Sequence, residues 1–196
     1  MATEQAGQRP ALAPGTVRKY LALADELRDL QEHVVAAVPP PDVSEAALAH
    51  VRAAGELLQP WAVDVLSQLA GRLDRAPGRG HTFAPITQVD ELGNDHLRAR
   101  VVFRRFHVGV GAVHGGAVSI VFDELLGQLA RAGTGHVPRT AYLNTAYRSL
   151  TPAGKDLTVD GAVTRSDGRK RFVTGTLLDG DRVCAEAEGL FVLSAV

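Results

Sequence analysis

Cysteine is nearly absent from this sequence, since Cys184 is the single one among 196 residues. A disulfide framework within the chain is therefore excluded, and a cysteine-based metal site is not expected. Cys184 lies in an apolar run between Val183 and Ala185. We therefore expect it to be a small, buried core residue.

Long apolar runs are also missing. No stretch reaches the roughly 18 consecutive apolar residues that a membrane-spanning helix needs, so no membrane span is expected. The first residues, MATEQAGQRPALAPG, lack the basic and then apolar pattern of a signal peptide. Together these absences predict a cytoplasmic protein.

An excess of charge of one sign is the third absence. Lys and Arg total 21 and Asp and Glu total 22, which gives a net charge of −1 and argues against nucleic acid as a partner. The sequence has no nucleotide motif and no zinc motif. Four histidines lack the spacing of metal ligands, so neither a metal nor a cofactor is predicted: His81, His96, His107 and His136.

The pattern of the sequence changes near residue 76. Residues 1–75 are predicted to be a helical extension that packs on the main domain or on a second subunit, and residues 76–196 to be the main domain. Residues 1–15 are expected to be disordered and 16–38 to form a helix that ends at the prolines of 39–41. Asp42 or Ser44 is expected to cap a second helix that ends near Leu58. A third helix is predicted from Pro60 to about Arg72.

The remaining sequence predicts strands around one long helix. Strands are expected at 83–90 and 97–106, and a helix follows from about Gly115 to Ala130. Four tightly linked runs follow and should be antiparallel neighbours. They span residues 140–150, 157–164, 171–178 and 182–193. This order predicts an α+β fold in which the helix covers one face of an antiparallel sheet.

A stripe of small residues distinguishes this predicted helix. Gly116, Ser119, Asp123 and Gly127 fall on the side opposite its apolar residues. The stripe is consistent with a groove for a substrate arm or a second subunit, but also with helix–helix packing. Asp123 is a poor helix former in mid-helix, and the alternative to a functional role is an Asp that only faces water.

The predicted start of the helix is suited to binding a developing negative charge. Its first amides have no partner within the helix and lie at the positive end of the helix dipole. Gly115 and Gly116 have no side chains, so a carbonyl oxygen can approach these N–H groups closely. The alternative is that the two glycines only form the turn into the helix.

Three segments together resemble the hotdog thioesterase superfamily, in its PaaI-like and thioesterase-superfamily-member branch. The first is His114-Gly115-Gly116 followed by an acid nine positions after the histidine. The second is the stretch from Thr140 to Tyr147, similar to Thr-x-x-Leu-Asn-x-x-Tyr, and the third is the turn Gly168-Arg169-Lys170. The resemblance covers about residues 80–194 and implies a hotdog fold.

The resemblance also implies a hydrolase that acts on acyl-CoA thioesters. Asp123 would be the catalytic carboxylate, either activating a water or attacking the thioester carbonyl directly. The N–H of Gly116 would polarise the thioester oxygen, and Thr140 would supply a hydroxyl near the attacking water. His114 would orient the carbonyl, or alternatively form a structural hydrogen bond that fixes the loop. Gly115 belongs to the same substrate-binding turn.

The remaining implications concern CoA and subunits. Arg169 and Lys170 are candidates for binding the CoA phosphates, with Arg148 as a further candidate. The loop 107–111 lacks the Asn that some family members carry. The active site would lie between two subunits of a homodimer or homotetramer. The alternative function is a non-catalytic acyl-CoA-binding regulator or partner subunit, and a hydratase or dehydratase is disfavoured by the order of the motifs.

Overall fold

The computed structural model describes residues 12–73 and 76–194. These residues form two compact units, which divide between Thr82 and Phe83. Most of the segment predicted to be disordered, residues 1–11, lies outside the described residues.

The first unit contains two of the three predicted helices, α1 (Thr16–Ala36) and α2 (Pro41–Leu58). α2 begins one residue before Asp42, with Pro40 at its N-cap and no side-chain capping bond. The predicted cap by Asp42 or Ser44 is therefore wrong. A proline at the first helical position has a backbone angle already suited to the helix and lacks only an N–H that has no partner there.

The predicted third helix is wrong. After α2 the chain makes only a short 3₁₀ turn, η1 (Gln59–Trp61). Asp64 then accepts hydrogen bonds from the Leu66 N–H and from the Ser67 hydroxyl, both at 2.8 Å. Such local side-chain bonds give the backbone an alternative to helix formation.

The last residues of the first unit are bound to α1. The buried Arg28 side chain donates to the carbonyls of Pro77 and His81. The Tyr20 hydroxyl donates to the carbonyl of Gly80 at 3.1 Å. These bonds explain why residues 76–82 belong to the first unit, although the sequence pattern changes before them.

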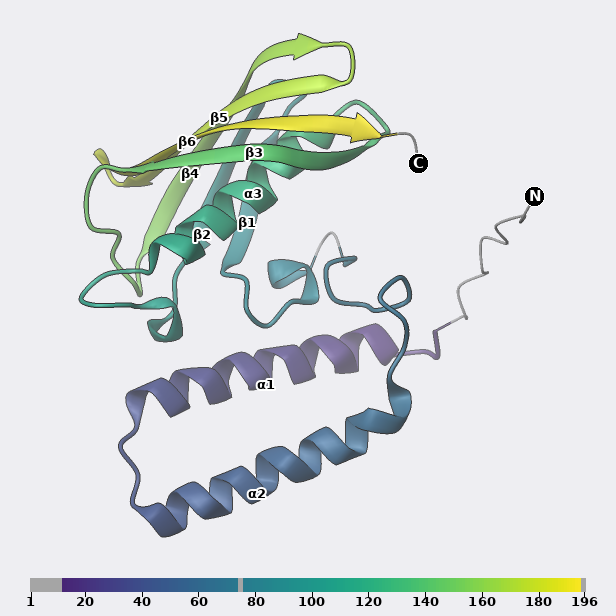
Figure 1. Cartoon of the computed structure of the whole chain (residues 1–196), viewed down its shortest axis with the longest axis vertical. Coiled ribbons are helices and arrows are strands. Elements are labelled where there is room, and N and C mark those ends of the chain that lie inside the picture. The colour runs from purple at the N-terminus through teal and green to yellow at the C-terminus, as the bar shows by residue number, and fades with distance from the viewer. Residues whose placement is uncertain (1–11, 74–75, 195–196) are drawn as a thin grey trace. The chain divides into compact units, whose positions relative to one another are not determined.

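The second unit is an antiparallel sheet with the helix α3 (Gly115–Arg131) along one face, as Figure 1 shows. This is the predicted α+β arrangement. The described residues form six strands, in the spatial order β1-β2-β4-β5-β6-β3. Their bounds are β1 (Ile86–Leu92), β2 (His96–Val102), β3 (Val137–Tyr147), β4 (Asp156–Asp167), β5 (Lys170–Asp179) and β6 (Arg182–Ser194).

One predicted strand pairing is wrong. β4, β5 and β6 are antiparallel neighbours as expected, but β3 pairs with β6, and β4 pairs with β2. The connection from β3 to β4 is held against the segment before α3, since Val113 N–H donates to Thr151 O and Gly154 N–H to Phe103 O. The chain thereby crosses from one part of the sheet to another, and β3 becomes an edge strand.

The core lies between α3 and the sheet. The apolar side of α3 is buried as predicted, including Val118, Phe122 and Leu125. Opposite it, a Cβ atom on Gly175 would lie only 3.1 Å from the Phe122 ring, so the glycine lets the helix approach the sheet. Cys184 is fully buried, as predicted.

Candidate active site

The small-residue stripe of α3 faces the edge strand β3. The Ser119 hydroxyl lies 3.2 Å from the Thr145 hydroxyl, and the Thr140 hydroxyl donates to Oδ1 of Asp123 at 2.7 Å. The stripe therefore packs against a strand rather than a second helix. Asp123 and Thr140, both predicted site residues, are brought together.

A β-bulge puts Thr140 on the side of the helix. Thr140 pairs with Phe191 and Tyr142 pairs with Leu190, which leaves Ala141 between them as an extra residue. Phe191 is a core residue, so Thr140 opposite it points to the same face. Because side chains alternate along a strand, a regular strand would turn Thr140 away from α3.

The Asp123 carboxylate and the Thr140 hydroxyl are both exposed to solvent. The Thr140 hydroxyl donates its hydrogen to Asp123. The lone pairs of the hydroxyl oxygen therefore remain as acceptors. A water molecule that donates to this oxygen would lie next to the carboxylate. The other acid of this helix, Glu124, accepts a hydrogen bond from Gln128 at 2.9 Å.

His114 is the N-cap residue of α3, and its side chain caps the start of the helix. The N–H of Gly116 donates to Nδ1 of His114 at 3.0 Å, and the N–H of His114 donates to the carbonyl of His107. His114 thus makes the loop-fixing hydrogen bond that was one of its two predicted roles. Its role towards a substrate carbonyl stays a prediction.

Comparisons with known proteins find chains of the same fold among thioesterase superfamily proteins. A crystal structure of a thioesterase superfamily protein matches with 27% identity and a TM-score of 0.73, over 88% of this chain and 90% of that chain. A Streptococcus mutans protein solved with acetyl CoA matches with 17% identity and a TM-score of 0.53, over 56% of this chain and 89% of that chain. Acyl-coenzyme A thioesterase THEM4 of Mus musculus is 33% identical over 84 residues, 42% of this chain but only 36% of that protein's length. No protein-family model matches the chain.

The chain thus has the hotdog fold of thioesterase superfamily proteins and is similar to them in sequence. Residues from Phe83 on are called the hotdog unit below, and the residues before them the helical unit. A match that covers about half of this chain, such as that of the Streptococcus mutans protein, is about as long as the hotdog unit alone. The match over 88% of the chain extends into the helical unit as well.

Tyr147 is a residue of the hotdog site that the sequence analysis did not select. Its hydroxyl donates to the carbonyl of Gly115 at 2.9 Å and lies 3.1 Å from the Ser119 hydroxyl. A Cβ atom on Gly115 would lie 2.8 Å from the tyrosine oxygen, so a larger residue there would displace the Tyr147 side chain. The signal was present, since Thr145 and Tyr147 alternate onto the helix side of β3.

Three predicted CoA-binding cations of the hotdog unit do not lie together. Arg169 and Lys170 are at the turn between β4 and β5. Arg148 instead donates to Glu186 at 2.6 Å. Glu186 alternates with the buried Ala185 and therefore points away from α3.

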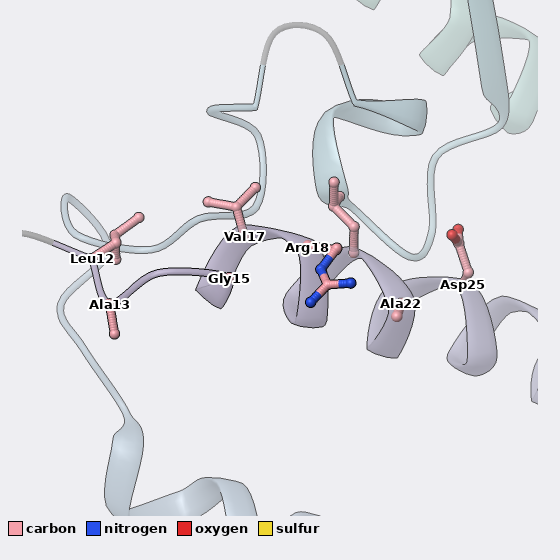
Figure 2. A pocket seen from close by; sticks show the side chains of 8 residues that line it. Leu12, Ala13, Gly15, Val17, Arg18, Ala22 and Asp25 are labelled. Atoms are coloured by element: carbon pink, nitrogen blue, oxygen red, sulfur yellow. The ribbon is translucent and has the colours of Figure 1, made fainter.

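A separate hollow of about 750 Å³ lies in the helical unit, where the segment before α1 meets its first turns (Figure 2). Its charged lining residues are Arg18 and Asp25. None of the predicted site residues lines it, and it carries no chemistry that we can assign.

Residues 12–73 and 76–194 contain neither a candidate metal site nor a candidate membrane span. Within these ranges, no group of three or more His, Cys, Asp or Glu side chains is arranged to hold a metal ion. No helix in the same ranges is both long enough and apolar enough to cross a bilayer.

Proposed function

We propose that the protein is an acyl-CoA thioesterase that hydrolyses an acyl-CoA to a free acid and CoA. The observation that carries this proposal is the exposed Asp123 carboxylate, hydrogen-bonded to Thr140 on the open edge of the sheet. The relation to Acyl-coenzyme A thioesterase THEM4 supports the same reaction class.

Asp123 acts in one of two ways. As a general base it takes a proton from water while the water oxygen attacks the thioester carbonyl carbon. As a nucleophile it attacks that carbon itself and forms an anhydride, which water then hydrolyses. In both routes the C–S bond breaks and the CoA sulfur leaves with the electron pair and is protonated. Thr140 orients the water through the lone pairs of its oxygen.

The N–H of Gly116 polarises the thioester carbonyl. In the ligand-free chain this N–H donates to His114 Nδ1, so a substrate oxygen has to replace the imidazole nitrogen. Rotation of the His114 side chain would free the amide. A positioned amide of this kind is worth roughly 3 kcal/mol in the transition state of acyl transfer.

The complete site needs a second subunit. Asp123 and Gly116 are seven residues apart on one helix, which corresponds to roughly 10 Å at 1.5 Å per residue. Attack needs the reacting atoms roughly 3–3.5 Å apart. The carbonyl held by Gly116 of one subunit therefore meets Asp123 of its partner. The open edge of β3 favours such pairing, in a homodimer or a pair of dimers.

The CoA phosphates bind at one end of the sheet, next to Thr140. Lys170 on β5 and Arg139 on β3 are both paired with Val192 of β6, so they flank it roughly 10 Å apart. Among the described residues neither has a carboxylate partner, and Arg169 in the adjoining turn has none either. Several other cations of the hotdog unit do pair with carboxylates: Arg98, Arg100, Arg148, Lys155 and Arg182.

The two-subunit site is tested by co-expressing Asp123→Asn with Gly116→Pro, which removes the N–H donor. Neither variant alone should hydrolyse acyl-CoA. Random pairing makes about half of the dimers mixed, and each mixed dimer regains one intact site, so about a quarter of the wild-type activity should return. Absence of recovery in verified mixed dimers would contradict a site shared between subunits.

The reaction itself is tested by free CoA release from short, medium, long and aromatic acyl-CoAs. Turnover of at least one member supports the proposal and identifies the acyl class. Tight acyl-CoA binding without release of CoA would instead support the alternative, a non-catalytic acyl-CoA-binding regulator or partner subunit on the same fold.

A further inference from the structure

The structure brings Tyr147 onto the peptide group that joins Gly115 to Gly116. This one planar unit contains both the carbonyl oxygen of Gly115 and the N–H of Gly116. The Tyr147 hydroxyl donates to that oxygen at 2.9 Å, and the N–H donates to His114 Nδ1 at 3.0 Å. The peptide is therefore held at both ends.

The contact is built by close packing as well as by the hydrogen bond. The nearest atoms to a Cβ placed on Gly115 all belong to the Tyr147 ring and its hydroxyl, at 2.8 to 3.2 Å. The Ser119 hydroxyl lies 3.1 Å from the Tyr147 oxygen and 3.2 Å from the Thr145 hydroxyl. This group of hydroxyls fixes the tyrosine oxygen above the first turn of α3.

We propose that Tyr147 is a positioning residue for the thioesterase reaction, acting through the Gly115–Gly116 peptide. This inference rests on the proposed role of the Gly116 N–H. A hydrogen bond to the oxygen of a planar peptide fixes the direction of its N–H. It also polarises the peptide, because hydrogen bonds in a chain strengthen one another, and so makes the N–H a stronger donor.

The Tyr147 hydroxyl should stabilise the transition state more than it strengthens substrate binding. The thioester oxygen gains negative charge only as the carbonyl carbon is attacked, so a stronger N–H donor stabilises that charge. Loss of the Tyr147 hydroxyl should therefore lower kcat and leave KM nearly unchanged. A tyrosine that only supported the fold would not produce this split.

Tyr147→Phe is the direct test, because phenylalanine keeps the ring over Gly115 and removes only the hydroxyl. Tyr142→Phe is the matched control, since Tyr142 is an exposed tyrosine on the same strand whose hydroxyl makes no hydrogen bond within the described residues. We expect kcat to fall roughly fivefold to tenfold in Tyr147→Phe, with KM changed less than about twofold. The control should keep both constants.

The amide proton of Gly116 gives a second readout that does not need activity. In protein labelled with ¹⁵N-glycine, its resonance should shift upfield in Tyr147→Phe and stay in place in Tyr142→Phe. An unchanged Gly116 resonance, or an unchanged kcat in an active enzyme, overturns the role of Tyr147. If the wild type releases no CoA from any acyl-CoA, the proposed function fails, and the Gly116 resonance still decides whether Tyr147 polarises the peptide.

Discussion

Within the hotdog unit α3 buries its whole apolar side against the sheet, whereas α2 of the helical unit has no buried residue at all. Both helices are amphipathic in sequence, so periodicity alone does not distinguish them. The difference is that α3 has a curved sheet around it, with glycines at the closest contacts. Large apolar side chains of α2 stay exposed: Val43, Leu48, Val51, Leu57 and Leu58.

The hotdog unit has a hydrophobic core of its own, which lies between α3 and the sheet. The Streptococcus mutans protein covers 56% of this chain and is itself covered over 89%. The matched part of this chain is therefore about as long as the hotdog unit. We therefore expect substitutions in the two units to change the free energy of unfolding by very different amounts.

The largest difference should appear on truncating one apolar side chain in each unit. Phe122→Ala leaves a cavity in the core and should cost about 3–5 kcal/mol of unfolding free energy. Leu57→Ala removes an exposed side chain and should change it by less than about 0.5 kcal/mol. Guanidinium unfolding followed by far-UV circular dichroism compares the two variants. Equal losses would contradict the contrast between the units.

Removal of the helical unit should affect the stability of the hotdog unit less, and should act mainly on the choice of substrate. A chain that begins at Phe83 should keep the sheet and α3, because their core lies within the hotdog unit. If the helices cover the acyl pocket, the preference between long and short acyl-CoAs should shift by roughly tenfold in kcat/KM. The full-length Leu57→Ala variant is the control. An unchanged ratio in an active truncated protein would exclude that role for the helices.

The smallest expected effect is on the pH dependence of stability, through two exposed aspartates, one in each unit. A hydrogen bond from Arg100 lowers the pKa of Asp90 below its usual 3.8, and one from Ser67 lowers the pKa of Asp64. With a lowered folded-state pKa, each stabilises the fold above the unfolded pKa and loses that contribution as the pH falls through the folded pKa.

The pKa values of these two aspartates should respond differently to salt. Added salt should raise the pKa of Asp90, because its partner is a charged guanidinium, and leave that of Asp64 nearly unchanged, because its partner is a neutral hydroxyl. Carboxyl NMR titrations at low and high salt measure both values in one sample. A shift of the same size at Asp64 would argue against this assignment.

The sequence predicted what depends on local patterns. The apolar positions of α3 and the strand-forming runs between turns are local, and both are found. The position of β3 beside β6 depends on how the connection to β4 packs on the loop before α3, which no local pattern contains. After Trp61 the predicted helix is replaced by turns, in which the Asp64 side chain accepts backbone and side-chain hydrogen bonds.

The site was predictable in its residue types but not in its contacts. Asp123 and Thr140 were selected through a resemblance, and the bulge at Ala141 that brings them together is not visible in the alternation of residues. A structural hydrogen bond of His114 was one of its predicted roles, but its partner, the N–H of Gly116, was not predicted, because an N-cap bond depends on a rotamer. Tyr147 was missed for a related reason, since its role depends on the helix start lying beside the end of β3.

The proposed function assigns thioester hydrolysis to Asp123. The most direct measurement is the rate of CoA release under single turnover, for the wild type, Asp123→Asn and the control Asp160→Asn, whose aspartate pairs with Arg98 instead. We predict a fall of at least about a hundredfold for Asp123→Asn and wild-type rates for the control. An Asp123→Asn protein that releases CoA at the wild-type rate would contradict the claim.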